Sequence, residues 1–207
     1  MNIIVYLETN FLMSVAMGRE GQSEELLAAV SESVHIAIPS SCYMESFSAF
    51  EDEQKRRNRF RDELERQIGQ LRRDTTSGNA KELVNRLEQS RIANDELLND
   101  VQARLFRLVE RAASIFEPIA EAPSVIYDAV TKMIIPDPTD NLILHVILGH
   151  ANRFPDATKA MLTENTRDFG SEDVQAALAA AGIKKSFRSI ANLLGWLGSL
   201  PDQAQIP

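Results

Sequence analysis

The sequence predicts an α/β fold of three layers (α/β/α), with a central, mainly parallel sheet and an inserted long α-helical hairpin. Short apolar runs alternate with amphipathic helical segments at both ends of the chain, which is the pattern of a parallel sheet covered by helices. Between these ends, a mostly charged region has apolar residues only at helical intervals. We therefore expect one domain over residues 1–200, a hairpin insertion at 51–113 and a tail at 201–207.

Three short apolar runs fit buried strands, and a fourth segment is a further candidate strand. These segments lie at residues 2–7, 34–39, 158–165 and 184–190. The segments around them have the spacing of amphipathic helices. They lie at residues 23–33, 40–50, 124–134, 139–154, 171–182 and 190–200. Hydroxyl residues suited to N-capping begin four of these helices, namely Ser23, Ser40 or Ser41, Thr139 and Ser171.

The insertion at 51–113 predicts two long helices joined by the polar turn "TTSGN" at 75–79. Its second helix has an apolar side formed by Leu83, Leu87, Leu97, Val101, Leu105 and Leu108. A helix of this kind can pair with a partner's hairpin or with a second copy of itself. We therefore expect the hairpin to be the surface for a homo-oligomer or for another protein partner.

The first helix of the insertion carries the only dense basic run of the chain, "KRRNRFR" at 55–61. Cations beside an aromatic ring suit contacts with nucleic-acid phosphates and a stacked base. The candidate nucleic-acid-binding residues are Lys55, Arg56, Arg57, Arg59 and Phe60. The alternative is a solvated helix face, because the three residues "EDE" before the run place an acid four positions ahead of each of its first three cations.

Composition excludes several classes of function. The formal net charge of −8 argues against sequence-blind coating of nucleic acid, although it does not exclude a nuclease. One cysteine excludes a disulfide within the chain, and three scattered histidines do not predict a zinc site. No run approaches the about 18 apolar residues of a membrane span, and the apolar N-terminal run is interpreted as a strand. We expect a cytoplasmic protein without a membrane partner.

Four acids lie where predicted strands end or where the next helices begin: Glu8, Glu45, Asp140 and Asp168. The carboxyl ends of parallel strands meet at one edge of a sheet, so the chain could bring these acids together. Oxygen-only ligands of this kind suit Mg²⁺ or Mn²⁺. Three of the acids also have a simpler explanation: Asp140 as a helix-start charge, Asp168 as a turn or cap, and Glu45 as a surface residue. Glu8 is less easily explained in this way, because it directly follows an apolar strand. The prediction depends on the four together.

The motifs around these acids resemble the PIN-domain family. The matching segments are "ETN" with Glu8 and Asn10, "MES" with Glu45, "TDNLIL" with Asp140, and "TENTRDF" with Thr163, Asn165 and Asp168. The resemblance covers residues 1–50 and 115–190, and the hairpin has no counterpart in the minimal family domain. It implies a PIN-like fold and hydrolysis of single-stranded RNA by a metal-activated water, as in an endoribonuclease that uses Mg²⁺ or Mn²⁺.

The resemblance also implies roles for individual residues. Glu8, Asp140 and Asp168 would bind the metal directly or through water, and Glu45 would be a ligand or would position the water. Asn10, Thr163 and Asn165 would support the site from outside the metal's own shell. Many related bacterial proteins are toxins held by an antitoxin, and others act in housekeeping or defence, so an antitoxin is a candidate partner besides the RNA substrate.

One departure from the family pattern supports a second hypothesis. The family usually has Asp where this chain has Glu8. The additional methylene moves the carboxylate oxygens, and metal geometry is set within a few tenths of an ångström. The alternative is therefore a PIN-fold protein that has lost its catalytic site and acts as a binding or assembly module through its helical hairpin. A dinucleotide enzyme or an NTPase is disfavoured, because no glycine-rich phosphate loop is present.

Overall fold

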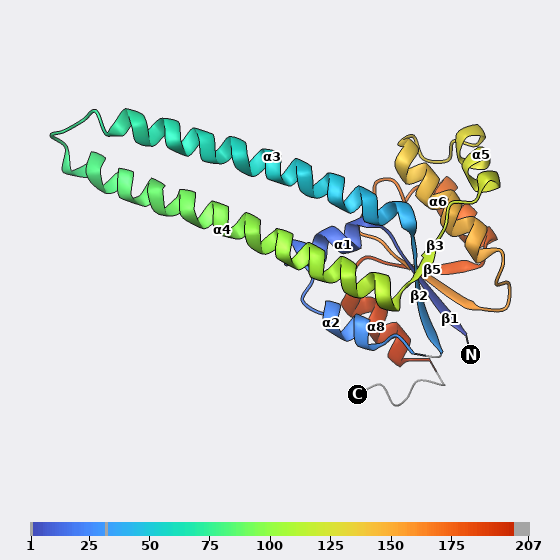
Figure 1. The fold of residues 1–207 in the computed structure, drawn as a ribbon. Coiled ribbons are helices and arrows are strands. Elements are labelled where there is room, and N and C mark those ends of the chain that lie inside the picture. Colours follow the sequence, from blue (N-terminus) through green and yellow to red (C-terminus); the bar gives the residue numbers. More distant parts are fainter. Residues whose placement is uncertain (1, 32, 201–207) are drawn as a thin grey trace.

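The computed structural model describes residues 2–31 and 33–200, and the predicted tail at 201–207 lies outside the described residues. Its centre is a five-stranded sheet with all neighbouring strands parallel, in the order β3-β2-β1-β4-β5. The strands are β1 Ile3–Leu7, β2 Val34–Pro39, β3 Glu117–Ile119, β4 Thr158–Leu162 and β5 Ile183–Phe187. Figure 1 shows α5 and α6 on one side of the sheet and α2 and α8 on the other. The predicted α/β/α fold with a parallel sheet is thus confirmed.

Strand β1 is the central strand and explains the order of the sheet. All five of its residues are buried, and Val5 pairs with Ile36 on one side and with Ala160 on the other. A strand that is buried on both faces must be apolar at every position, as "IIVYL" is. Its carboxyl end, where the chain turns into Glu8, therefore lies at the middle of the sheet edge.

Eight helices lie within the described residues. They are α1 Thr9–Ala16, α2 Ser23–Ala28, α3 Ser40–Leu71, α4 Gly78–Ile115, α5 Pro123–Thr131, α6 Pro138–Ala151, α7 Glu172–Ala180 and α8 Ile190–Gly198. The sequence analysis did not predict α1 or β3. Helix α1 is short and follows β1 after a single residue, and β3 has only three residues. No helix in the described part of the chain is both long and apolar enough to cross a membrane.

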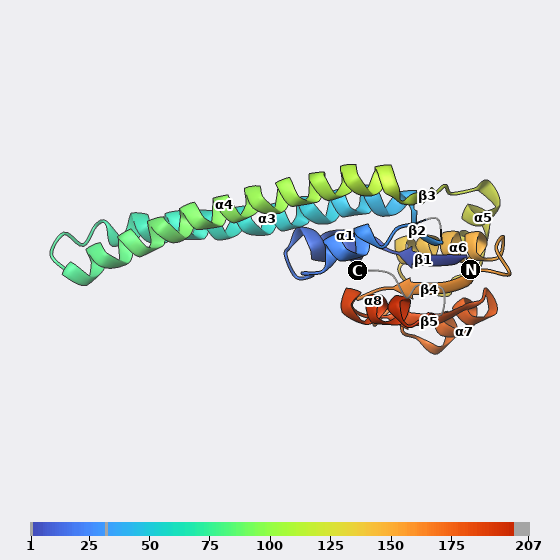
Figure 2. The ribbon, with the colours of Figure 1, turned by 90° about the horizontal axis from the view of Figure 1, so that it is seen from below.

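Helices α3 and α4 form the predicted hairpin, which projects from the sheet as a long arm (Figures 1 and 2). Helix α3 begins at Ser40, so the helix predicted at 40–50 and the first helix of the insertion are one continuous element. Half of the predicted apolar side of α4 is used inside the chain, because Val101, Leu105 and Leu108 are buried. Leu83 and Leu97 remain 44% and 38% exposed. Pairing of the hairpin with a partner stays a prediction.

The basic run lies on α3, and acids of the same helix neutralise much of it. Lys55 pairs with Asp52 at 2.8 Å, and Arg56 and Arg57 both pair with Glu53. The last of these pairs has the predicted spacing of four residues, whereas the other two form over three residues. This geometry favours the interpretation of a solvated helix face. In contrast, Arg59 is exposed without an ion pair in the described chain, and Phe60 is 48% exposed.

Several helix caps differ from those predicted. Asp137, not Thr139, caps α6, because its side chain accepts hydrogen bonds from the backbone N–H groups of Thr139 and Asp140. Helices α2 and α3 begin after Gln22 and Pro39 without a side-chain cap from the predicted serines. For α3, the carboxylate of Glu121 accepts from the Ser41 N–H at 2.8 Å instead. The predicted cap of α7 at Ser171 is confirmed.

Candidate active site

The four predicted acids come from four elements that meet at the carboxyl edge of the sheet. Glu8 lies between β1 and α1, Glu45 in the second turn of α3, Asp140 in the first turn of α6, and Asp168 in the loop after β4. Their charges act on one another: the carboxylates of Asp140 and Glu45 raise the pKa of Glu8, and those of Glu45 and Asp168 raise the pKa of Asp140. The structure therefore brings the four acids together.

Glu8 is the most buried of these acids, with 2% of its surface exposed. One carboxylate oxygen, Oε2, accepts a hydrogen bond of 2.8 Å from the backbone N–H of Asn10, so Glu8 is also the N-cap of α1. The other oxygen, Oε1, is buried and has no hydrogen-bond partner in the described structure. Burial raises the pKa of Glu8 to about 7, with smaller contributions from Asp140 and Glu45, and outweighs the lowering effects of the Asn10 N–H and the Thr163 hydroxyl. A buried acceptor without a hydrogen-bond donor is unfavourable, so a proton or a cation at Oε1 would stabilise the site.

A second group of contacts joins α6 to the loop after β4. The side-chain amide of Asn165 donates to Asp140 Oδ2 at 3.1 Å, and its carbonyl oxygen accepts from the Asp168 N–H at 3.2 Å. The buried hydroxyl oxygen of Thr163 accepts from the Asn165 N–H at 3.1 Å. Asn165 thus fixes two of the acids relative to each other. Burial and the charges of neighbouring acids raise the pKa of Asp140 to about 6.

Glu45 is held by Thr9, a residue to which the sequence analysis gave no role. The hydroxyl group of Thr9 donates a hydrogen bond to Glu45 Oε2. Thr9 is buried in the first turn of α1, directly after Glu8, so α1 contacts two acids of the site through successive residues. Asn10 contributes through its backbone N–H and not through a side-chain hydrogen bond.

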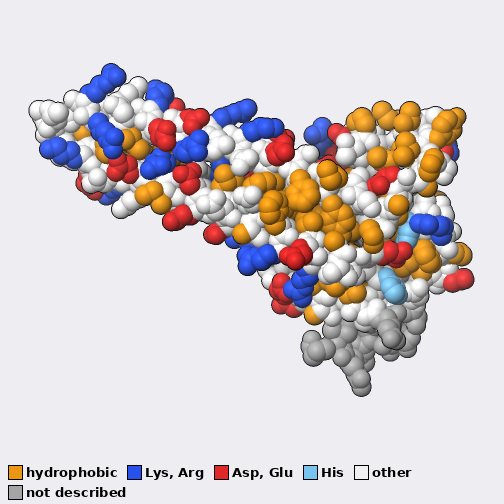
Figure 3. Space-filling model, in the orientation of Figure 1, with side chains coloured by type: hydrophobic (Ala, Val, Ile, Leu, Met, Phe, Trp, Pro, Cys, Tyr) orange, Lys and Arg blue, Asp and Glu red, His pale blue; other side chains and the backbone are white. Residues whose placement is uncertain are grey.

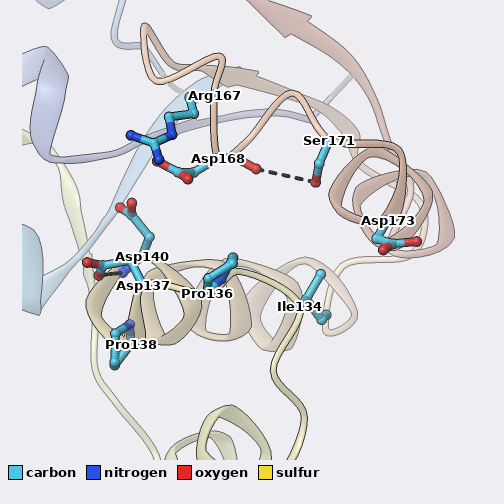
Figure 4. Close-up of a pocket in the computed structure, with 9 residues that line it drawn as sticks. All are labelled: Ile134, Pro136, Asp137, Pro138, Asp140, Arg167, Asp168, Ser171 and Asp173. Carbon is cyan, nitrogen blue, oxygen red and sulfur yellow. Dashed lines mark hydrogen bonds between the residues drawn. The ribbon is translucent and has the colours of Figure 1, made fainter.

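A pocket of about 740 Å³ opens beside the acids (Figure 4). Asp137 and Asp140 line it from α6, and Arg167 and Asp168 line it from the loop after β4, across the pocket from α6. Asp173 in the first turn of α7 lines it further along. The prolines on both sides of Asp137 indicate only a rigid turn in the sequence, and the sequence analysis gave Arg167 no role. The only signal for Arg167 in the sequence is its position directly before Asp168.

The side chains present fit a hard divalent cation in their chemistry. They offer carboxylate oxygens only, which Mg²⁺ and Mn²⁺ prefer, and Glu8 has a free buried acceptor. Two of the acids also have raised pKa values, so a cation would relieve repulsion. Across residues 2–31 and 33–200, however, no group of three or more His, Cys, Asp or Glu side chains has its ligand atoms gathered for a metal ion.

A parallel α/β sheet with acids gathered at the carboxyl ends of its strands defines a class of proteins that act on ligands at that edge. The chain belongs to the PIN-domain family, because the family model for the PIN domain matches residues 5–169. That range contains the last three residues of β1, the strands β2 to β4, the hairpin and all four acids. Neither the curated proteins nor the solved structures give a match to this chain. PIN domains are typically nucleases and generally use divalent metal ions.

Proposed function

We propose that this protein is a metal-dependent endoribonuclease that hydrolyses phosphodiester bonds of single-stranded RNA with Mg²⁺ or Mn²⁺. The observation that carries this proposal is the buried, unpartnered Oε1 of Glu8 within a group of four acids in a chain of the PIN-domain family. When bound, the metal ion would lower the pKa of a water molecule and offset the charge of the phosphate.

Different residues of the chain would bind the cation, accept the proton and orient these groups. Glu8, Asp140 and Asp168 would hold the cation, and Glu45, which the Thr9 hydroxyl orients, would hold the cation or accept a proton from the attacking water. Asn165 holds Asp140 and Asp168 in a fixed position relative to each other, and the Thr163 hydroxyl orients Asn165. The backbone N–H of Asn10 orients Glu8, so that Oε1 is the oxygen left for the ligand.

The experiment that tests this function is cleavage of labelled single-stranded RNA with Mn²⁺, with Mg²⁺ and with EDTA. A double-stranded RNA and a single-stranded DNA of the same sequence define the substrate. We expect cleavage of the single-stranded RNA only with metal, and its loss in Asp168→Asn. Metal-independent cleavage that Asp168→Asn retains would reveal a contaminating nuclease, and folded protein without cleavage in either metal would reject the proposal.

Changing Asn165 to alanine separates positioning from metal binding. It removes two hydrogen bonds that hold Asp140 and Asp168, yet it leaves every carboxylate in place. Loss of a residue that orients metal ligands typically costs about 10- to 100-fold in metal affinity or activity. We expect a loss of that size in kcat/KM, with part of it recovered at high Mn²⁺ concentration. Asn192→Ala is a matched control, because Asn192 is an exposed residue of α8 far along the chain.

An exposed apolar surface beside the pocket supports a protein partner. Helix α5 leads into the loop at 132–137, part of which lines the pocket, and it exposes Tyr127 and Val130 by 70% and 77%. Hydrophobic side chains gather over α5 in Figure 3. Exposed apolar patches of this kind mark interaction sites. We therefore extend the proposal to a toxin or defence nuclease whose antitoxin or other protein partner covers this surface.

The alternative function is a binding or assembly module with a lapsed catalytic site. It is supported by the absence of a gathered metal-ligand group among the described residues and by Glu8 in the place of the usual Asp. This alternative predicts a folded protein that binds neither Mn²⁺ nor Mg²⁺ but forms a stable complex or oligomer. Analytical ultracentrifugation of the same sample that is used for cleavage distinguishes the two functions.

A further inference from the structure

Arg167 is the one cation among the residues that line the acidic pocket. The other charged residues that line it are Asp137, Asp140, Asp168 and Asp173. Arg167 is exposed, and in the described part of the chain its guanidinium makes no hydrogen bond and no ion pair. Figure 4 shows its side chain on the same loop as Asp168, across the pocket from Asp140. An arginine among four acids that pairs with none of them is free to bind a ligand.

Two exposed cations elsewhere in the described chain do pair with a nearby acid. Arg66 pairs with Glu63 at 2.6 Å, and Lys132 pairs with Asp128 at 3.0 Å, although all four side chains are accessible to water. Arg167 has acids at least as near in sequence, since Asp168 is the next residue. The Asp140 carboxylate instead accepts a hydrogen bond from the Asn165 side-chain amide, and the Asn165 carbonyl oxygen accepts from the backbone N–H of Asp168.

The backbone of the loop determines where Arg167 lies. The N–H groups of Phe169 and Gly170 donate to the carbonyl oxygens of Asn165 and Thr166 at 3.0 and 3.1 Å, which closes a tight turn. Phe169 is fully buried and anchors this turn in the core. A Cβ atom at position 170 would lie 2.2 Å from the Thr166 carbonyl oxygen, so only glycine fits there. Because Phe169 is anchored in the core, the turn fixes the backbone of Arg167 beside the pocket.

The charge distribution of the chain explains why a cation is needed at this place. Outside residues 51–113 the chain has 8 Lys and Arg but 17 Asp and Glu, which leaves a charge of 8 − 17 = −9. A phosphodiester strand that approaches the acids therefore meets a strongly negative surface. Arginine presents a planar fork of donors that matches two oxygens of one phosphate, and it remains charged at every relevant pH.

We infer that Arg167 is a substrate-binding residue that holds a phosphate of the RNA strand in the acidic pocket. The inference rests on the proposed ribonuclease function for the identity of the ligand. Arg167 binds the strand and exchanges no proton with it, so it acts on affinity and on the position of the strand. The acids act on the metal ion and the water. The pocket thus offers a positive charge to the anionic substrate and negative charges to a cationic cofactor.

Equilibrium binding of a labelled single-stranded RNA in EDTA tests this inference, because no cleavage takes place. The variants are Arg167→Ala, Arg167→Lys and, as a matched control, Arg153→Ala, which removes an exposed cation just beyond the far end of α6. We expect Arg167→Ala to weaken binding roughly 10-fold or more, as for other hydrogen bonds between charged groups. The slope of log K against log salt concentration should become shallower by about 0.7, as for one lost phosphate contact.

The lysine variant and the control complete the test. Arg167→Lys should keep the salt slope, because the charge remains, but should recover only part of the affinity, because the two-pronged contact is lost. Arg153→Ala should bind like the unchanged protein. Equal affinity and equal slope for Arg167→Ala would overturn the inference, and so would an unchanged protein that does not bind RNA. Arg167-dependent binding without cleavage in Mn²⁺ would keep the inference and reject the ribonuclease function.

Discussion

Asp140→Asn should abolish metal-dependent cleavage of RNA and, at the same time, make the fold more stable. The loss follows from the position of Asp140 within the acids that would hold the cation, and removal of such a charge costs several kcal/mol of transition-state stabilisation, or about 10³-fold in rate. The gain follows from the raised pKa of Asp140, near 6, which means that its charge is disfavoured in the folded protein. An asparagine oxygen can still accept the hydrogen bond from Asn165.

The stability gain is measurable at pH 7.5 without metal. After allowance for the partial exposure of Asp140, we expect the free energy of unfolding to rise by about 1–2 kcal/mol. Urea denaturation of both proteins measures this difference. Asp173→Asn is the matched control, because Asp173 lines the same pocket but favours the N-terminus of α7. The control should keep its activity within a few-fold and should not gain stability. An Asp140→Asn protein that cleaves RNA at the normal rate would remove Asp140 from the site.

The stability of the protein should fall as pH rises from about 4.5 to 7, and a divalent cation should restore it. Burial raises the pKa of Glu8 from 4.5 in the unfolded chain to about 7 in the folded protein. The folded state therefore binds this proton more tightly, so the stabilising contribution of Glu8 is fully present below pH 4.5 and is lost as pH rises through 7. For a group as buried as Glu8 the decline amounts to about 3 kcal/mol, an order-of-magnitude figure. Asp140 adds a decline between 3.8 and about 6.

Thermal unfolding at pH 5 and pH 8, with and without Mn²⁺, measures this coupling. We expect Mn²⁺ to raise the melting temperature at pH 8 and to have little effect at pH 5, where protons occupy the site. Glu8→Gln should be more stable than the unchanged protein at pH 8 and should lose most of the response to Mn²⁺. The effects of changes at Glu8 and Asp140 should not add, because the Asp140 carboxylate contributes, after burial, to the raised pKa of Glu8. A Glu8→Gln protein that is no more stable than the unchanged protein at pH 8, or that keeps the full response to Mn²⁺, would contradict this account.

The sequence predicts the sheet well, because its signals are local. Strand β2 has the predicted bounds, since Pro39 ends an apolar run at the sheet edge. Strand β4 ends at Leu162, three residues earlier than predicted, because Thr163 and Asn165 form the hydrogen-bonded turn of the site instead of continuing the strand. The position of Glu8 follows from the order of the strands. Because β1 is the central strand, Glu8 lies at the middle of the carboxyl edge of the sheet.

Other features depend on contacts between distant residues and carry no local signal. The Thr9 hydroxyl reaches Glu45 across 36 positions of the sequence, and the Glu121 carboxylate reaches the start of α3 across 80. Arg167 appears in the sequence as one cation among many, and its isolation among aspartates is visible only when α6 and the loop after β4 face each other. The spacing of residues in the sequence predicts the helix or strand on which a residue lies. The fold determines which other side chains that residue contacts.

The central claim is that the four acids at the sheet edge hold a divalent cation. Isothermal titration of the protein with Mn²⁺ at pH 7.5 tests it most directly, with Asp140→Asn and Asp173→Asn titrated beside it. The account predicts saturable binding that Asp140→Asn abolishes or weakens at least 10-fold and that Asp173→Asn retains. Folded protein that takes up no Mn²⁺, or that takes it up equally in all three forms, would contradict the account.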